Sequence, residues 1–235
     1  MARQWDPNIE TLSKAVDKLG PIADEVVFLG GCATGLLITD PAAPPIRATA
    51  DVDVITEVTS LVEYYQLAER LRQRGFLEDR SPGAPICRWK LENTLLDVMP
   101  TDPFLLGFGN QWFTPALAAA KSVELPSGKN IRMVLAPYFL ATKLEAFDGR
   151  GKGDYLASHD IEDIVAVLDG RREIVDEILE ASKSLQTYLS ERFATLLETR
   201  EFMETLPGHL PSDAASQARM PLIKERIEAI ARQKL

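Results

Sequence analysis

Five residues, DVDVI at positions 51–55, constrain the fold of this chain more than any other stretch. Their β-branched side chains favour a strand, and their apolar character places that strand in a core. Side chains alternate faces along a strand, so Asp51 and Asp53 share one face, with Cα atoms roughly 7 Å apart. Carboxylates on a core strand are costly unless a positive group compensates them. The stretch therefore predicts a central sheet and, on one of its faces, a site for a divalent cation.

A glycine pair precedes this strand. Gly30 and Gly31 lie between the apolar run EVVFL (residues 25–29), which predicts a buried strand, and ATGLLI (residues 33–38), which predicts a short helix. Because glycine has no side chain, backbone N–H groups there can approach a phosphate closely, and a helix N-terminus favours its charge. Alone, such a pair more often marks only a turn, but the nearby carboxylates favour a phosphate site.

Asp97 is a third acid within an apolar strand pattern, TLLDVMP at residues 94–100. If this strand lies beside residues 51–55, the three carboxylates converge on one face. Mg²⁺ typically takes one or two carboxylates and completes its coordination with waters and substrate phosphates. A pair of metals about 3.5–4 Å apart, Mg²⁺ or Mn²⁺, can hold the attacking and the leaving oxygen of a phosphoryl displacement. The three acids therefore predict metal-dependent phosphoryl chemistry.

The first part of the chain alternates strand and helix patterns, and the second part is helical. Beyond Pro137 apolar positions recur at spacings of three and four residues, and no strand pattern returns. We expect an α/β (α+β) fold, with a small mixed β-sheet core over residues 1–136 and a C-terminal helical bundle over residues 137–235. In the core, helices are predicted at residues 8–19 and 60–74, and hairpins at residues 86–100 and 122–135.

Composition and charge narrow the class of protein. Of the 235 residues, 46% are hydrophobic and 26% are charged, as in ordinary soluble globular proteins. The sequence has no run of 18 apolar residues, so neither a membrane span nor a membrane partner is expected. The formal net charge of −9 argues against an extended surface for duplex DNA. Cys32 and Cys87 lie in apolar stretches and are expected to be free, buried thiols in a cytoplasmic protein.

Together these motifs resemble the minimal nucleotidyltransferase superfamily, which has the DNA polymerase β-like fold. The motifs are FLGG (28–31), RATADVDVI (47–55) and LLDVMP (95–100). Within the superfamily, the chain is most similar to the AbiEii-type nucleotidyltransferases of type IV toxin–antitoxin systems. That similarity covers residues 24–168 and adds a helical Lys-x-x-Ala-x-x-x-Arg element and a later Asp-x-x-Asp element. These elements are matched here by Lys143, Ala146, Arg150, Asp160 and Asp163.

The resemblance implies an enzyme that moves a nucleoside monophosphate from an NTP to an acceptor hydroxyl. It implies that Asp51, Asp53 and Asp97 are catalytic and bind Mg²⁺ or Mn²⁺, with Asp97 helping to activate the acceptor. The implied role is that of a toxin with a cognate antitoxin as partner, and with RNA, such as the end of a tRNA, as acceptor. The residues implied for NTP binding are Gly30, Gly31, Arg47, Thr49, Lys143, Arg150 and Asp160.

Four of these residues also have structural interpretations. Lys143 is either a triphosphate contact or a surface lysine. Arg150 either binds a substrate phosphate or pairs with Asp160 or Asp163. Asp160 is alternatively the N-cap of the helix that follows it. Arg47 either reaches a phosphate or orders the proline-containing loop beside it.

Two other functions are compatible with the same motifs. An antibiotic nucleotidyltransferase, acting on an aminoglycoside or a lincosamide-like drug, shares the Gly-Gly and Asp-x-Asp core, and the acidic net charge suits a cationic acceptor. A non-catalytic nucleotide-binding module is expected to lose one of the core acids, and all three are present here. An RNA acceptor is favoured by a group of basic residues, Arg47, Lys143, Arg150, Lys152, Arg171 and Arg172.

Overall fold

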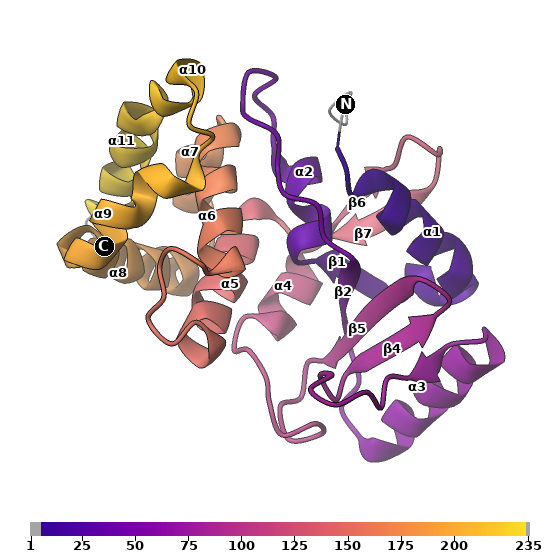
Figure 1. Cartoon of the computed structure of the whole chain (residues 1–235). Coiled ribbons are helices and arrows are strands. Elements are labelled where there is room, and N and C mark those ends of the chain that lie inside the picture. The colour runs from indigo at the N-terminus through magenta and orange to yellow at the C-terminus, as the bar shows by residue number, and fades with distance from the viewer. Residues whose placement is uncertain (1–5, 234–235) are drawn as a thin grey trace. The chain divides into compact units, whose positions relative to one another are not determined.

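The computed structural model describes residues 6–233, and this part of the chain divides into two compact units (Figure 1). One unit, here called the sheet unit, comprises the chain up to Gly35 together with Arg47–Leu135. The other, the helical unit, comprises Leu36–Ile46 and the chain from Ala136 onward. No helix within residues 6–233 is both long enough and apolar enough to cross a membrane.

Within the described residues, a seven-stranded sheet forms the core of the sheet unit (Figure 1). Its strands, in spatial order, are β3 (Leu77–Glu78), β4 (Arg88–Leu91), β5 (Thr94–Pro100), β2 (Asp51–Thr56), β1 (Val26–Leu29), β7 (Asn130–Met133) and β6 (Lys121–Glu124). β2 pairs with β5 and β1 with β7 in parallel, and the other neighbours are antiparallel. The predicted mixed sheet and both predicted hairpins are therefore confirmed.

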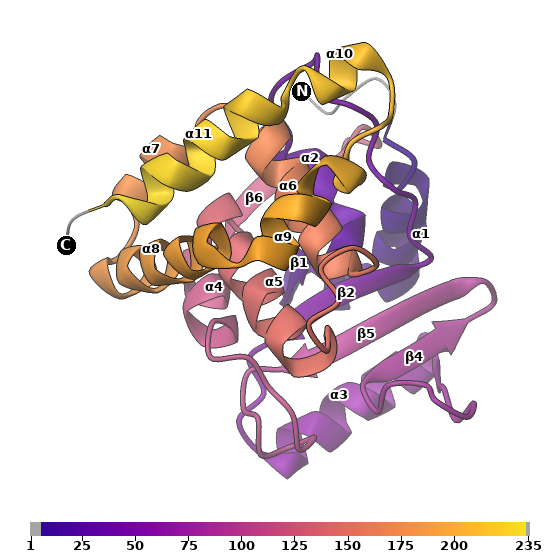
Figure 2. The same ribbon diagram turned by 60° about the vertical axis from the view of Figure 1, so that its left-hand side comes forward.

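The register of β2 and β5 brings the predicted acids together. Asp53 lies directly beside Asp97 in the parallel pair, and Asp51 lies two residues earlier on the same face. β4 and β5 form an antiparallel hairpin (Figure 2). In its register, Arg88 lies opposite Asp97. Three adjacent strands therefore place three carboxylates and one guanidinium group on one face of the sheet.

The opposite face of these strands is apolar. Val52 and Val54 of β2 are completely buried, and so is Leu96 of β5. The alternation predicted for residues 51–55 is thus confirmed. Burial of this face fixes the register, because a slip of one residue would turn the carboxylates into the core.

Helices and short 3₁₀ turns complete the part of the chain before residue 136. They are α1 (Ile9–Leu19), η1 (Gly20–Asp24), η2 (Gly31–Ala33), α2 (Thr34–Leu37), α3 (Leu61–Gln73) and α4 (Phe113–Ala119). The helix predicted at residues 60–74 is confirmed as α3, and the Ser60 hydroxyl accepts a hydrogen bond from the Glu63 backbone N–H at its start. α4 and β3 were not predicted from the sequence, because seven and two residues are too few to show a period.

The helical unit contains only helices and turns within residues 136–233, as predicted. They are α5 (Ala136–Arg150), α6 (His159–Gly170), α7 (Ile174–Leu179), α8 (Lys183–Glu198), α9 (Arg200–Thr205), η3 (Leu206–His209), α10 (Ala214–Gln217) and α11 (Met220–Ala231). The helical pattern over residues 172–206 forms three helices, because the backbone is extended at Ser182 and Thr199. α11 lies beside α8 (Figure 2).

The segment Leu36–Ile46, here called the crossover segment, packs within the helical unit although both flanking segments belong to the sheet unit. The backbone N–H of Asp40 donates to the carbonyl of Gly170, at the end of α6, at 2.8 Å. The Asp40 carboxylate pairs with Arg172 and Arg219, each at 2.8 Å. Burial alone would raise the pKa of this carboxyl, but the two arginines outweigh it and hold the pKa well below its usual range.

Leu96→Ala should lower the free energy of unfolding by about 2–5 kcal/mol, because it removes a completely buried side chain from the apolar face of β5. Leu95→Ala is the matched control, since the same substitution one residue earlier removes a side chain that is only half-buried. Its cost should be clearly smaller. Chemical denaturation measures both losses, and equal losses would contradict the assignment of the two faces of β5.

Candidate functional site

Three carboxylates on β2 and β5 form the candidate site of the sheet unit. We call Asp51, Asp53 and Asp97 the acid cluster. The side chain of Asp97 is 9% exposed and that of Asp51 is 35% exposed, so the cluster lies partly below the surface. The strand pairing that the sequence analysis required for these acids to converge is confirmed by the register of β2 and β5.

Arg88 of β4 supplies positive charge to the acid cluster. Its Nε and one terminal nitrogen donate to the two oxygens of Asp97, each at 2.7 Å. The same terminal nitrogen donates to Oδ2 of Asp51 at 2.9 Å. A guanidinium that binds a carboxylate through two parallel bonds makes a strong and directional pair, and these bonds raise the pKa of Arg88 above its ordinary value. Arg88 was not predicted as a site residue, and the only signal for it in the sequence was its place opposite Asp97 in the predicted hairpin.

Asp51 is also held by the hydroxyl of Thr49, which donates to its Oδ1 at 2.5 Å. Burial alone would raise the pKa of Asp51, but the Thr49 hydrogen bond and the charges of Arg88 and Arg47 outweigh it. The pKa therefore lies below its usual value, and the carboxylate is ionised at neutral pH. Thr49 and Arg47, which the resemblance implies for NTP binding, both act on Asp51.

Gly30 approaches the acid cluster more closely than a residue with a side chain can. Its φ is +74°, and a Cβ atom added there would lie 1.9 Å from Oδ2 of Asp53. Only glycine fits both the backbone conformation and the space. The elements after the pair, η2 and α2, are only three and four residues long, so they add little helix dipole for a phosphate. The phosphate contacts of Gly30 and Gly31 stay a prediction.

Asn8, at the start of α1, joins the glycine pair to the segment before β2. Its side chain is completely buried. Oδ1 accepts a hydrogen bond from the Thr49 backbone N–H at 2.9 Å, and Nδ2 donates to the carbonyl of Arg47 at 3.1 Å and to that of Gly31 at 3.5 Å. Asn8 thereby positions two loops of the candidate site. This role of Asn8 was not predicted, because one asparagine before a helix indicates only a cap.

The acid cluster offers carboxylate oxygens on a shared face, which is the type of ligand that Mg²⁺ prefers. Within residues 6–233, however, no three His, Cys, Asp or Glu side chains are arranged so that they could hold a metal ion. The Arg88 guanidinium takes both oxygens of Asp97 and one of Asp51. The carboxylate chemistry of the cluster therefore suits Mg²⁺ or Mn²⁺, whereas the arrangement of these side chains, with Arg88 bound to two of the acids, does not hold one.

The two cysteines are free and buried, as predicted. Burial raises the pKa of both thiols, and that of Cys87 reaches about 12. For Cys32, the carboxylate of Asp53 adds to the effect of burial. Neither residue is a thiolate at neutral pH, so neither is a candidate nucleophile.

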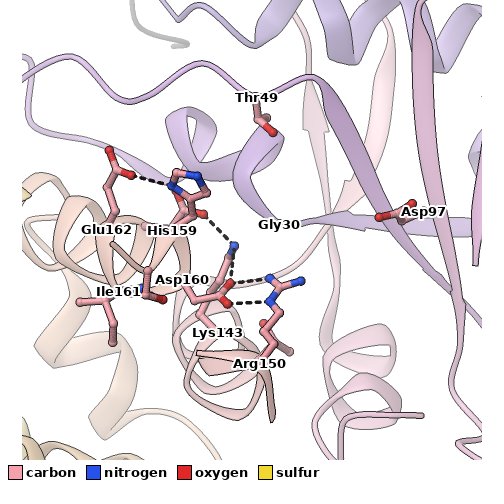
Figure 3. Close-up of polar contacts among 12 residues, drawn as sticks. Gly30, Thr49, Asp97, Lys143, Arg150, His159, Asp160, Ile161 and Glu162 are labelled. Atoms are coloured by element: carbon pink, nitrogen blue, oxygen red, sulfur yellow. Dashed lines mark hydrogen bonds and ion pairs between the residues drawn. The ribbon is translucent and has the colours of Figure 1, made fainter. Parts of the chain in front are cut away.

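A second charged cluster lies within the helical unit, between α5 and the start of α6 (Figure 3). The Lys143 ammonium lies 3.2 Å from Oδ1 of Asp160 and 2.7 Å from Oδ2 of Asp163, and all three side chains are more than nine-tenths buried. Arg150 donates to both oxygens of Asp160, at 2.7 and 2.8 Å. Burial alone would raise the pKa of Asp160, but Arg150 and Lys143 outweigh it and keep the pKa below its usual value.

These contacts decide between the structural interpretations of three residues. Lys143 is not a surface lysine. The N-cap of α6 is Ser158, whose hydroxyl accepts a hydrogen bond from the Ile161 backbone N–H, so the alternative that Asp160 caps this helix is wrong. Arg150 forms the salt bridge to Asp160 that the sequence allowed. The NTP contacts that the resemblance implies for these residues stay predictions.

Gly30→Ala should destabilise the protein more than Gly128→Ala. Both glycines have a positive φ, so both alanines carry a backbone cost of about 1–2 kcal/mol. A Cβ atom at Gly128 meets nothing within 4 Å, whereas one at Gly30 collides with Asp53. In an Asp53→Ala background the extra cost of Gly30→Ala should shrink, and chemical denaturation of the double-mutant cycle measures this coupling. Strictly additive losses would contradict the close contact.

Lys143→Ala should lower the free energy of unfolding by about 3–5 kcal/mol, because it leaves Asp160 and Asp163 buried without the cation they share. Arg150→Ala is the matched control. Its side chain is 70% exposed, and an exposed pair contributes about 1 kcal/mol or less. Denaturant titration of the two variants tests the difference, and a loss at Lys143 no larger than at Arg150 would refute the structural role.

Comparison with known proteins identifies the fold. No protein-family model matches the chain, and no curated protein matches it. Among solved structures, it is similar to an antigenic nucleotidyltransferase-like protein from Paracoccidioides brasiliensis, with 20% identity and a TM-score of 0.52 over 86% of this chain and 93% of that one. It is also similar to JHP933 from Helicobacter pylori, with 13% identity and a TM-score of 0.48 over 96% of this chain and 91% of that one. The first similarity shows that the chain has the fold of a nucleotidyltransferase-like protein.

Proposed function

We propose that this protein is a metal-dependent nucleotidyltransferase, which moves a nucleoside monophosphate from an NTP to an acceptor hydroxyl. One observation carries the proposal: three carboxylates from two parallel strands share one face, and the backbone of a glycine in the left-handed region packs against one of them. The shared fold with a nucleotidyltransferase-like protein supports it.

In this proposal the acid cluster holds Mg²⁺ or Mn²⁺, which when bound supplies the charge that neutralises the triphosphate. The backbone N–H groups of Gly30 and Gly31 bind phosphate oxygens. The acceptor hydroxyl attacks the α-phosphate, its proton passes to the Asp97 carboxylate, and pyrophosphate leaves as the bond between the α- and β-phosphates breaks. Lys143 and Arg150 both form ion pairs with Asp160. Any contact that they make with the NTP therefore competes with these ion pairs.

For the acceptor we propose the end of an RNA, such as a tRNA, with the protein acting in the cytoplasm as the toxin of a pair with a cognate antitoxin. The resemblance to AbiEii-type proteins is the support for this part. Four of the six basic residues that favoured RNA form ion pairs within the helical unit, since Lys143 and Arg150 pair with Asp160, Arg171 with Glu177 and Arg172 with Asp40. The group therefore offers an RNA less positive charge than its sequence indicates.

Asp51→Asn and Asp53→Asn should each reduce transfer at least about 100-fold, the loss typical when one preorganised charged group is removed from an active site. The fold should persist, because each change relieves repulsion within the acid cluster. Asp79→Asn is the control, since this acid pairs with Lys90 outside the cluster. The assay incubates the protein with each labelled NTP, Mg²⁺ and total RNA, and follows labelled product. Full activity of the two cluster variants would refute the site.

The same assay, run beside one with aminoglycosides and lincosamides, separates the acceptor classes. Labelled RNA that depends on Asp53 supports the toxin proposal. Labelled drug with no labelled RNA would replace it with an antibiotic nucleotidyltransferase. NTP binding without transfer to any acceptor would favour a non-catalytic nucleotide-binding module.

A further inference from the structure

We propose that Arg88 is a built-in counter-ion of the acid cluster. It prevents free divalent metal from binding to the carboxylates, and it moves away from them when a nucleoside triphosphate binds together with its metal ion. This inference rests on the proposed function, since it concerns the same carboxylates. It assigns Arg88 a positioning role that no motif of the sequence indicated.

The backbone directs Arg88 at the acid cluster. It lies opposite Asp97 in the antiparallel pair of β4 and β5, so the two side chains leave the sheet on the same face. Because β2 lies on the other side of β5, the same guanidinium also reaches Asp51. The side chain is only 18% exposed. Arg88 is therefore part of the site and not a solvated arginine that lies over it.

Every carboxylate oxygen of Asp51 and Asp97 accepts a hydrogen bond. Arg88 donates to both oxygens of Asp97 and to one of Asp51, and Thr49 donates to the other. A metal ion bound by these two carboxylates must replace the bonds to Arg88. A divalent cation and a guanidinium only a few ångströms apart also repel each other strongly in a partly buried site. Arg88 and the metal are therefore alternatives at this position.

A nucleoside triphosphate changes this competition. Guanidinium binds phosphate as well as carboxylate through paired hydrogen bonds, so a triphosphate at the cluster offers Arg88 a new partner. The triphosphate also ligates Mg²⁺ through its own oxygens. Arg88 can then pass from Asp51 and Asp97 to phosphate oxygens as metal and nucleotide bind together.

The experiment measures Mn²⁺ binding to the full chain without nucleotide, by electron paramagnetic resonance and calorimetry. Arg88→Met removes the charge and keeps the length of the side chain. It should bind Mn²⁺ at least about tenfold more tightly than the wild-type protein, which corresponds to about 1.4 kcal/mol. Arg88→Met combined with Asp51→Asn should lose this gain. Arg80→Met, at an arginine that is 86% exposed and pairs with Glu78, should leave Mn²⁺ affinity unchanged.

Thermal unfolding gives a second readout. In chelator, Arg88→Met should melt below the wild-type protein, because Asp97 and Asp51 then lose the guanidinium that binds both of them, and Mn²⁺ should raise its melting temperature. The wild-type melting temperature should hardly respond to Mn²⁺. If Arg88→Met does not fold, Arg88→Lys replaces it. Lysine keeps the charge but not the paired geometry, and its Mn²⁺ affinity should then exceed that of the wild-type protein.

Equal Mn²⁺ affinity of the wild-type protein and the Arg88 variants would overturn the inference, and so would a gain that persists in the Asp51→Asn background. The outcome is separable from the proposed function. A gain in Mn²⁺ affinity without NTP transfer by the wild-type protein supports the role of Arg88 and refutes the enzyme. Transfer without the gain refutes only the role of Arg88.

Discussion

The pairing of Arg88 with Asp97 and Asp51 is the interaction on which the candidate site depends. The buried apolar faces of β2 and β5 fix which side chains point inward, and the register of the parallel pair places carboxylates in adjacent positions on the other face. Such an arrangement is repulsive unless positive charge lies within it. β4, the neighbouring strand of the hairpin, places the guanidinium of Arg88 beside the carboxylates. Hydrophobic burial thus sets the position of the acids, and Arg88 compensates the repulsion between their carboxylates.

In the helical unit, a lysine compensates the charge of buried carboxylates in a similar way. Lys143 is inserted between two buried aspartates of α6, and Arg150 closes the same cluster from the solvent side. Breaking a buried pair by removing one partner is costly, because the other charge stays desolvated. A residue of this kind has a structural role whatever ligand it meets. Substitutions at Lys143 therefore report on folding and on any nucleotide contact at the same time.

Most of the fold follows from periodicity in the sequence. The alternation at residues 51–55, the two hairpins and the helical pattern beyond Pro137 each reflect burial of one face, which a sequence displays directly. The convergence of the three acids was predictable once β2 and β5 were taken as neighbours. Asn8 was not predictable, because its role depends on loop packing between residues distant in sequence. Arg88 had one signal, its place opposite Asp97 in the predicted hairpin, but its bond to Asp51 also depends on the pairing of β5 with β2. The partners of Lys143 are likewise set by how two helices meet.

The crossover segment makes contacts with residues that are synthesised much later than the segment itself. It leaves the sheet unit after Gly35, packs in the helical unit, and returns at Arg47 to enter β2. Its Asp40 pairs with Arg219, which lies 179 residues later in the chain. At roughly 5–20 residues per second of synthesis, that partner follows after about 9–36 seconds. During this interval the segment that joins the glycine pair to β2 lacks one of the ion pairs of Asp40, so a nascent chain that stops short of Arg219 presents an incompletely anchored loop to chaperones and proteases.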